Sequence, residues 1–157
     1  MNVKGDCHIK VSTKVECGII ALIDIALYSE NGKPVAVSGI SSRQNISMKY
    51  LEQILVALRQ ANLIRSLKGF KGGYVMARPA DQITFQEILD ALDVTILGNV
   101  NFYDTDQDPI LKNILNDCLW DQMTSYLRNF SNSITLAEII EKYRESLSDA
   151  EEPMYYI

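Results

Sequence analysis

The residues best suited to bind a charged partner lie in a basic, glycine-rich stretch at positions 66–74, which reads Ser-Leu-Lys-Gly-Phe-Lys-Gly-Gly-Tyr. Its glycines permit a tight turn and a close approach of the main chain to another surface. Lys68 and Lys71 supply positive charge that can neutralise phosphate groups. Because apolar, strand-forming residues flank the stretch, the sequence predicts a β-hairpin with a cationic tip. Taken alone, the stretch could equally be a glycine-rich turn with solvated lysines.

A predicted helix-turn-helix directly precedes the hairpin. Its first helix is expected to begin at Ser38 and to end at Gln44, with a turn at residues 45–46. Its second helix is expected to run from Ser47 to Ala61, because apolar residues recur there at the i, i+3, i+4, i+7 spacing of one buried face. These residues are Leu51, Ile54, Leu55 and Leu58. A helix-turn-helix followed by a basic hairpin is the outline of a winged DNA-binding domain, whose second helix presents its first turn to the major groove.

Polar side chains at the start of the second helix are candidate DNA contacts. Ser47, Lys49 and Tyr50 can hydrogen-bond to base edges or phosphates, and the helix N-terminus itself attracts a phosphate. Glu52 can accept a hydrogen bond from a cytosine amine, or it can pair with a neighbouring cation instead. Tyr50 can equally be a half-buried packing residue. The further cations that we assign to the DNA-binding surface are Arg59, Lys68 and Lys71.

The charges divide the chain into a basic and an acidic part. The formal net charge of −5 would by itself disfavour a nucleic-acid partner. Residues 1–78, however, hold 11 Lys and Arg against 5 Asp and Glu, whereas the remaining residues hold 4 against 15. This split is typical of a polyanion-binding module joined to a module of another kind. The acidic part, taken alone, could simply be a solvated surface.

The composition indicates an ordered cytoplasmic protein. The 157 residues, of which 47% are hydrophobic and 22% charged, can form one main domain with an appended element. No apolar run approaches the roughly 20 residues of a membrane span, and the N-terminus lacks the apolar core of an export signal. The three cysteines have no repeated spacing, which argues against a disulfide framework and a zinc site. One histidine, and no nucleophile beside a base, argue against a catalytic site.

The remaining pattern predicts four segments. Residues 1–92 are expected to form the winged helix-turn-helix domain, including a first helix capped by Ser12 or Thr13 and a later helix that Thr84 and Glu87 begin with a capping box. Residues 93–109 are expected to be a loop, residues 110–147 dimerisation helices, and residues 148–157 an acidic C-terminal tail. The last helix is expected to run from Leu136 to about Ser146, with its cap in the preceding Ser133-Ile-Thr135.

A long helix is predicted from Ile110 to about Asn129. Its stripe of large apolar side chains is more than a small domain can cover, so we expect it to pair with the same helix of a second subunit. A two-fold dimer would place two recognition helices about one DNA turn, roughly 34 Å, apart. The alternative is that this helix folds back on its own domain. The residues expected in the dimer interface are Ile110, Ile114, Leu115, Leu119, Met123 and Leu127.

The runs Ser47-Met-Lys-Tyr-Leu-Glu-Gln-Ile-Leu55 and Gly69-Phe-Lys-Gly-Gly-Tyr74 resemble the bacterial Rrf-type regulators, the group of IscR, NsrR and CymR. The resemblance covers nearly the whole chain. It implies a homodimeric winged helix-turn-helix transcription factor that binds double-stranded DNA. The family's recognition helix corresponds to the predicted second helix, and its wing to the basic hairpin. Beyond these two elements, the resemblance also implies DNA contacts at Thr13, Lys14 and Ser38. The chain departs from the family's pattern at Glu16, which puts a carboxylate where relatives have a cation facing phosphate.

A second departure concerns the iron-sulfur cluster that sensors of this family carry. Residues 94–109 contain no cysteine, and Ile114 and Asp117 stand where the family's last cysteine and histidine are expected. Cluster irons need thiolate ligands, so we expect no cofactor and no metal site. In this respect the chain is similar to the cluster-free CymR branch, which implies a repressor of cysteine or sulfur metabolism. That branch also implies cysteine synthase as a partner, docked on a tail ending in Tyr156 and Ile157.

Two other functions stay open. One is a cofactor-bearing regulator that senses redox state, iron or nitric oxide. The other is a protein-interaction module that binds a metabolic enzyme through its C-terminal tail, whose apolar residues could instead pack on a neighbouring surface.

Overall fold

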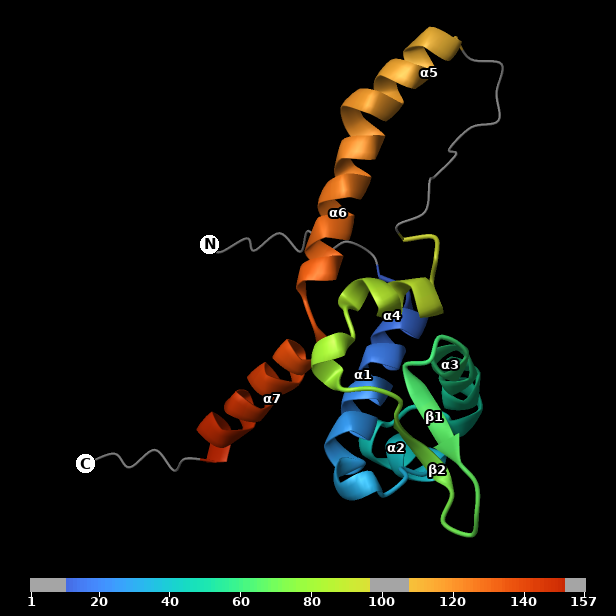
Figure 1. Ribbon diagram of the computed structural model, residues 1–157, viewed down its shortest axis with the longest axis vertical. Coiled ribbons are helices and arrows are strands. Elements are labelled where there is room, and N and C mark those ends of the chain that lie inside the picture. The colour runs from blue at the N-terminus through green and yellow to red at the C-terminus, as the bar shows by residue number, and fades with distance from the viewer. Residues whose placement is uncertain (1–10, 97–107, 152–157) are drawn as a thin grey trace, which may run out of the picture.

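The computed structural model describes residues 11–96 and 108–151, whose arrangement is shown in Figure 1. Four helices and a β-hairpin form one domain, and two helical segments leave that domain in different directions (Figure 1). The predicted class, mainly α with a small β-hairpin, is confirmed. Most of the predicted loop, and the tail residues Tyr156 and Ile157, lie outside the described residues.

Helix α1 (Thr13–Tyr28) contributes much of the core of the domain. Ser12, one of the two expected caps, accepts a hydrogen bond from the Val15 N–H at 3.4 Å. Gly18 allows α4 (Phe85–Leu92) to approach α1 closely, because a Cβ at this position would lie 2.2 Å from a methyl carbon of Leu92. After α1 follows a short 3₁₀ turn, η1 (Glu30–Gly32).

The predicted helix-turn-helix consists of α2 (Val37–Gln44) and α3 (Met48–Gln60). Helix α2 begins one residue earlier than predicted: Ala36 is its N-cap and makes no side-chain cap, so Ser38 lies in the first turn. The turn is fixed by Asn45, whose φ of 54° lies in the left-handed region that asparagine tolerates. The Ser41 hydroxyl donates to the Ile46 carbonyl across this turn at 2.7 Å. The predicted inner face of α3 is buried at all four apolar positions, which confirms the periodicity: Leu51, Ile54, Leu55 and Leu58.

The predicted hairpin consists of β1 (Ile64–Leu67) and β2 (Gly73–Met76), which pair antiparallel with Ser66 opposite Tyr74. Val35 pairs with the other edge of β2, donating to the Tyr74 carbonyl at 2.8 Å and accepting from the Tyr74 N–H at 2.9 Å. Gly73 permits this approach, because a Cβ there would lie 2.4 Å from the Val35 carbonyl oxygen. The hairpin is thus attached to the segment that leads into α2.

Helix α4 follows a 3₁₀ turn, η2 (Ala80–Gln82), and begins with the predicted capping box. The Thr84 hydroxyl accepts from the Glu87 N–H at 3.3 Å, and the Glu87 carboxylate accepts from the Thr84 N–H at 3.0 Å. The same segment holds the junction between the last two helices, since the Phe85 N–H donates to the Ile134 carbonyl at 2.9 Å.

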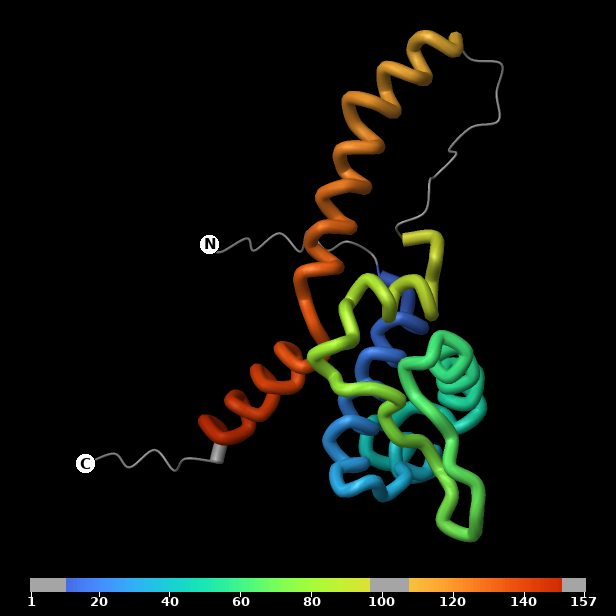
Figure 2. Tube along the Cα trace, viewed as in Figure 1, coloured from blue at the N-terminus to red at the C-terminus, as the bar shows by residue number. Residues whose placement is uncertain are grey.

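The predicted long helix is a continuous rod that rises away from the domain (Figure 2). It comprises α5 (Pro109–Leu115), a π-helical turn η3 (Asn116–Trp120) and α6 (Asp121–Ser133). The rod extends beyond the predicted end at Asn129, and the wide turn in its middle was not predicted. Helix α7 (Leu136–Glu151) starts where expected and ends later than Ser146. None of the described helices is both long and apolar enough to cross a membrane.

Candidate nucleic-acid interface

The start of α3 is held by Ser47, the N-cap that the sequence predicted. Its hydroxyl oxygen accepts from the Tyr50 N–H at 3.3 Å, and its carbonyl accepts from the Leu51 N–H at 3.0 Å. A hydroxyl has two acceptor lone pairs and one hydrogen, so Ser47 can still donate to a ligand while it caps the helix. The unpaired N–H groups of the first turn add a partial positive charge there.

The side chains that follow Ser47 differ in exposure. Lys49 and Glu52 are exposed, and neither has an ion pair with any residue in the described part of the chain. The interpretation of Glu52 as a partner of a neighbouring cation is therefore not what the structure shows. Tyr50 is half-buried and packs against the core, which favours the packing interpretation of its ring.

The tip of the hairpin carries uncompensated positive charge. Lys68 and Lys71 are exposed and form no ion pair with residues 11–96 or 108–151. Arg65 on β1 is also exposed and was not among the predicted DNA contacts. The alternation of buried Ile64 with exposed Arg65 in a short strand is the signal that could have identified it.

The remaining predicted contacts do not all lie beside the hairpin tip. Arg59 is exposed in the last turn of α3, about 18 Å along the helix axis from Ser47 at a rise of about 1.5 Å per residue. Thr13 and Lys14 lie at the start of α1, which Figure 1 places beside α4 at the end of the domain away from the hairpin tip. Ser38 is exposed in the first turn of α2. A duplex could contact all of these residues only by running along the whole domain.

Lys14 also lies near an acidic side chain. Hydrogen bonds from Thr95 are the main cause of a lowered pKa of Asp93, and the charge of half-buried Lys14 adds a smaller contribution. Glu16, the departure from the family's pattern, is exposed two residues further along α1. The start of α1 is therefore less basic than the hairpin and the start of α3.

A buried ion pair holds the helix-turn-helix on α1, and sequence reasoning missed it. The Asp24 side chain is completely buried and accepts from Arg43 Nε at 2.9 Å, from Arg43 Nη2 at 2.6 Å and from Gln44 Nε2 at 2.8 Å. The Arg43 guanidinium also lies over the Tyr28 ring, 4.0 Å from its centroid. The hydrogen bond to Asp24 raises the pKa of Arg43. These contacts attach the last turn of α2, and with it the turn before α3, to the core helix.

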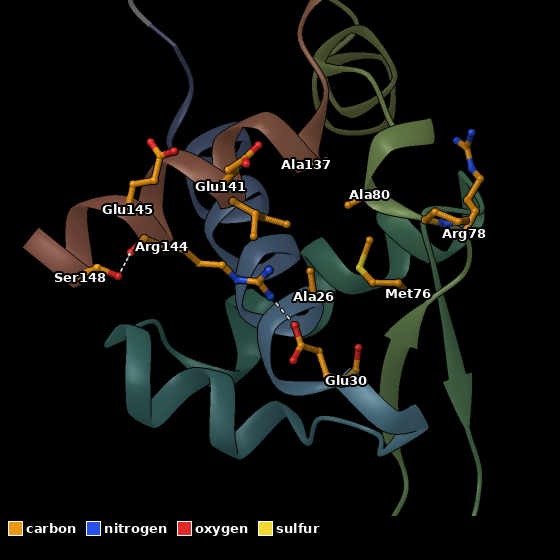
Figure 3. Close-up of a pocket in the computed structure, with 13 residues that line it drawn as sticks. Ala26, Glu30, Met76, Arg78, Ala80, Ala137, Glu141, Arg144, Glu145 and Ser148 are labelled. Carbon is orange, nitrogen blue, oxygen red and sulfur yellow. Dashed lines mark hydrogen bonds and ion pairs between the residues drawn. The ribbon is translucent and has the colours of Figure 1, made fainter.

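A cleft of about 740 Å³ lies between α7, the end of α1 and the segment after β2 (Figure 3). An ion pair between Arg144 and Glu30 spans it (Figure 3). Arg78 at its edge pairs with Glu87 at 2.6 Å. Both arginines that line the cleft are thus matched by carboxylates, and Glu141 and Glu145 also line it. This excess of acidic groups makes the cleft unsuited to nucleic acid, unlike the hairpin.

The rod presents the predicted apolar stripe. Its large apolar side chains from Ile110 to Phe130 are 37–73% exposed, apart from Leu127. Leu127 is partly buried against the core of its own domain, so the fold-back alternative holds for this one position. Within the described ranges, no three His, Cys, Asp or Glu side chains lie close enough to hold a metal ion.

Comparison with known proteins agrees with this architecture. The Rrf2 family, described as an iron-dependent transcriptional regulator, matches residues 11–142. The chain is 34% identical over 136 residues to the HTH-type transcriptional regulator IscR of Cronobacter sakazakii, covering 83% of this chain and 80% of that protein.

Solved structures give the same result. The structure of CymR, the global cysteine regulator of B. subtilis, matches with a TM-score of 0.68 and 29% identity over 86% of this chain and 98% of that one. The structure of T. potens IscR matches with a TM-score of 0.63 and 32% identity over 95% and 93% of the two chains. The proteins of this family regulate transcription and are not enzymes. The chain therefore belongs to the Rrf2 family of helix-turn-helix, DNA-binding transcription regulators.

Proposed function

We propose that this regulator recognises a specific sequence with the first turn of α3 in the major groove and grips the adjacent backbone with the β1–β2 wing. The observation that carries the proposal is a set of exposed charged side chains that form no ion pair within the described residues. Lys49 and Glu52 are exposed at the start of α3, and the basic wing is attached through Val35 to the same helix-turn-helix. We expect it to act in the cytoplasm.

Each side chain at the start of α3 has a chemical role in this proposal. Lys49 can donate to the O6 and N7 acceptors of guanine, and Glu52 can accept from the N4 amine of cytosine. Ser47 caps the helix and donates its hydroxyl hydrogen to a phosphate or base. Tyr50 positions the helix through its packing. Arg59, Lys68 and Lys71 contact phosphates, whereas Thr13, Lys14 and Ser38 contribute only if the duplex extends along the domain.

We further propose that the regulator is a homodimer joined through the α5–α6 rod. The exposed stripe at Ile110, Ile114, Leu115, Leu119 and Met123 supports this, because an apolar surface of this length is stabilised by burial against a second copy. Two-fold symmetry would then place the two α3 helices about 34 Å apart, and the target would be nearly palindromic.

Selection of duplexes from a random-sequence library by the purified protein tests sequence recognition. We expect a nearly palindromic duplex to be enriched. Lys68→Ala should weaken binding to all duplexes and lower the salt slope by about one for each phosphate that is no longer neutralised. Lys142→Ala on α7 removes the same charge far from the wing and is the matched control. Lys49→Ala should change the preferred sequence. Equal binding to every duplex, or none at low salt, would contradict the proposal.

Sedimentation of the Leu119→Asp variant tests the dimer. A carboxylate in the proposed interface should give a monomer that retains the helical content of the unchanged protein and binds a palindromic duplex more weakly. Glu141→Gln on α7 serves as a control that alters charge away from the rod. If Leu119→Asp sediments like the unchanged protein, the rod is not the interface.

We propose that the regulator is a repressor without an iron-sulfur cluster. Its structural similarity to CymR and the lack of cysteine at residues 94–109 support this. The family description as iron-dependent favours the alternative, a cofactor-bearing sensor. Absorbance and iron content of anaerobically purified protein separate the two: colourless, iron-free protein supports the first, and cluster absorbance with bound iron supports the second.

Control of cysteine or sulfur metabolism with cysteine synthase as partner is a further proposal, which depends on the resemblance to CymR. Mixing purified cysteine synthase with the full chain and with a chain lacking residues 154–157 tests it, since Tyr156 and Ile157 would be the docking residues. A complex that forms equally with both chains would exclude the tail as the docking segment, and no complex with either would exclude this partner.

A further inference from the structure

Phe70 is the most exposed large apolar side chain in the described residues. Its relative exposure is 104%, whereas the next value, at Tyr126 on the rod, is 73%. Single exposed apolar residues are common on proteins and need no explanation by themselves. Phe70 differs because it stands at the tip of the wing, between Lys68 and Lys71, and has no neighbouring apolar side chain in the core cluster.

The backbone around Phe70 holds it away from the domain. Gly69 has a φ of 136°, a conformation that side chains other than glycine rarely adopt. A Cβ at Gly72 would lie 2.7 Å from the Leu67 carbonyl oxygen, so the chain can close the hairpin tightly only with glycine there. The two strands behind the tip are fixed by their pairing and by Val35. Phe70 lies in the turn between β1 and β2 and is fully exposed. This turn is the end of the hairpin that lies farthest from α4 (Figure 1).

The charges around Phe70 indicate which partner covers it. Lys68 and Lys71 are exposed and carry no ion pair within the described ranges. Lysine is depleted in the cores of protein–protein interfaces, so an aromatic residue between two lysines is poorly suited to a protein partner. Phosphates lie on both sides of the DNA minor groove, and minor-groove proteins insert apolar wedges such as phenylalanine between base steps. The tip thus has the composition of such a wedge.

We propose that Phe70 is an apolar wedge that enters the minor groove while Lys68 and Lys71 bind the phosphates on either side. The inference rests on the proposed function, because it needs the wing to lie on DNA. The ring contacts sugars and base faces and partly unstacks one base step. Pyrimidine–purine steps unstack most easily, so Phe70 adds a preference for these steps at a position that α3 does not contact.

The test uses the full-length protein and the tightest-binding duplex recovered from a random-sequence library by the unchanged protein. Phe70→Ala should weaken binding to this duplex by about tenfold, within the range measured when aromatic residues that stack on bases are replaced by alanine. Its salt slope should not change, because no charge is removed. Lys71→Ala should instead lower the slope by about one. Phe70→Trp should retain tight binding because its ring can also stack.

A second measurement reports the wedge directly. Fluorophores at the two ends of the duplex should show a bend in the complex with the unchanged protein, since inserted side chains kink DNA by about 20–90°. The bend should be smaller with Phe70→Ala. Phe70 is fully exposed, so this substitution leaves the fold intact, which circular dichroism checks.

The outcomes separate the two levels of inference. If the library yields no preferred duplex, the proposed function is wrong and the wedge with it. If a preferred duplex is found and Phe70→Ala binds and bends it like the unchanged protein, the wedge alone is wrong. If Phe70→Ala weakens binding but the bend is unchanged, the ring contacts DNA without insertion and the wedge is again overturned.

Discussion

Replacing Arg43 by alanine should destabilise the helix-turn-helix, although Arg43 is not part of the apolar core. The substitution removes two hydrogen bonds to Asp24 and the contact with the Tyr28 ring. It leaves the buried Asp24 carboxylate with only the hydrogen bond from Gln44. The protein interior cannot solvate a charge as water does. The loss of folding free energy therefore arises mainly from the unpaired Asp24 carboxylate that remains buried.

The magnitude follows from the exposure of the two side chains. Breaking a buried ion pair from one side costs about 3–5 kcal/mol. The Asp24 side chain is 0% exposed, but Arg43 is 34% exposed, so water can replace part of the guanidinium after it is removed. We therefore expect the free energy of unfolding to fall by about 3 kcal/mol, the lower end of this range. For a chain of this length, where 1 kcal/mol shifts Tm by about 2–4 °C, the melting temperature should fall by about 6–12 °C.

Thermal and urea unfolding at one fixed protein concentration measure this change, because the stability of the proposed dimer would depend on concentration. The double variant Asp24→Asn/Arg43→Ala should be more stable than Arg43→Ala alone, since it no longer buries an unpaired charge. Lys49→Ala, which removes an exposed cation from α3, is the control and should change stability by less than about 0.5 kcal/mol. A loss below about 1 kcal/mol for Arg43→Ala, or a double variant that is less stable than Arg43→Ala, would show that the buried Asp24 charge does not depend on Arg43.

Two further substitutions probe the attachment of the wing. Burial raises the pKa of Glu87, but hydrogen bonds from the Thr84 N–H and Arg78 outweigh this effect and the pKa is lowered. Its ionised form therefore stabilises the fold above the unfolded-state pKa of about 4.3, and this stabilisation is lost as the pH falls through the lower folded-state pKa. Glu87→Gln keeps the cap and should cost about 0.2–1 kcal/mol at pH 7, a difference that should vanish in acid when unfolding is followed against pH. Gly73→Ala should destabilise the protein by about 1–3 kcal/mol in urea unfolding, because its Cβ would lie 2.4 Å from the Val35 carbonyl oxygen, whereas exposed Ser66→Ala should cost little.

Much of the domain could be predicted because its local sequence signals agree with its tertiary contacts. Ser47 and Thr84 cap helices as expected, since their hydroxyls satisfy N–H groups within three residues. Asn45 marks the turn because it tolerates the left-handed conformation. The glycines of the predicted hairpin lie where a Cβ would collide with the main chain, 2.7 Å from the Leu67 carbonyl oxygen at Gly72 and 2.4 Å from the Val35 carbonyl oxygen at Gly73. Local chemistry of this kind can be identified from the sequence alone.

The features that were missed depend on residues far apart in the chain. Asp24 and Arg43 are separated by 19 positions, and no periodicity indicates that they meet. Ser38 looked like a helix cap because serine is favoured there, but the bridge between Val35 and Tyr74 precedes a helix that starts one residue earlier. The π-helical turn η3 likewise breaks a spacing that the sequence presents as regular. Tertiary contacts set these details, so a single sequence does not reveal them.

The net charge of −5 does not conflict with DNA binding, because 15 of the 20 Asp and Glu residues follow the hairpin in the sequence, at positions 79–157. The acidic part of the sequence includes the rod and α7, and Figure 1 shows both leaving the domain away from the hairpin tip. At physiological salt the Debye length is about 8 Å, so exposed charges beyond that distance contribute little to the potential at the wing. In the proposed complex, a phosphate at the wing would therefore experience mainly the charges of Lys68, Lys71 and Arg65. The more distant carboxylates affect chiefly the solubility of the protein and its repulsion from DNA that the wing does not touch.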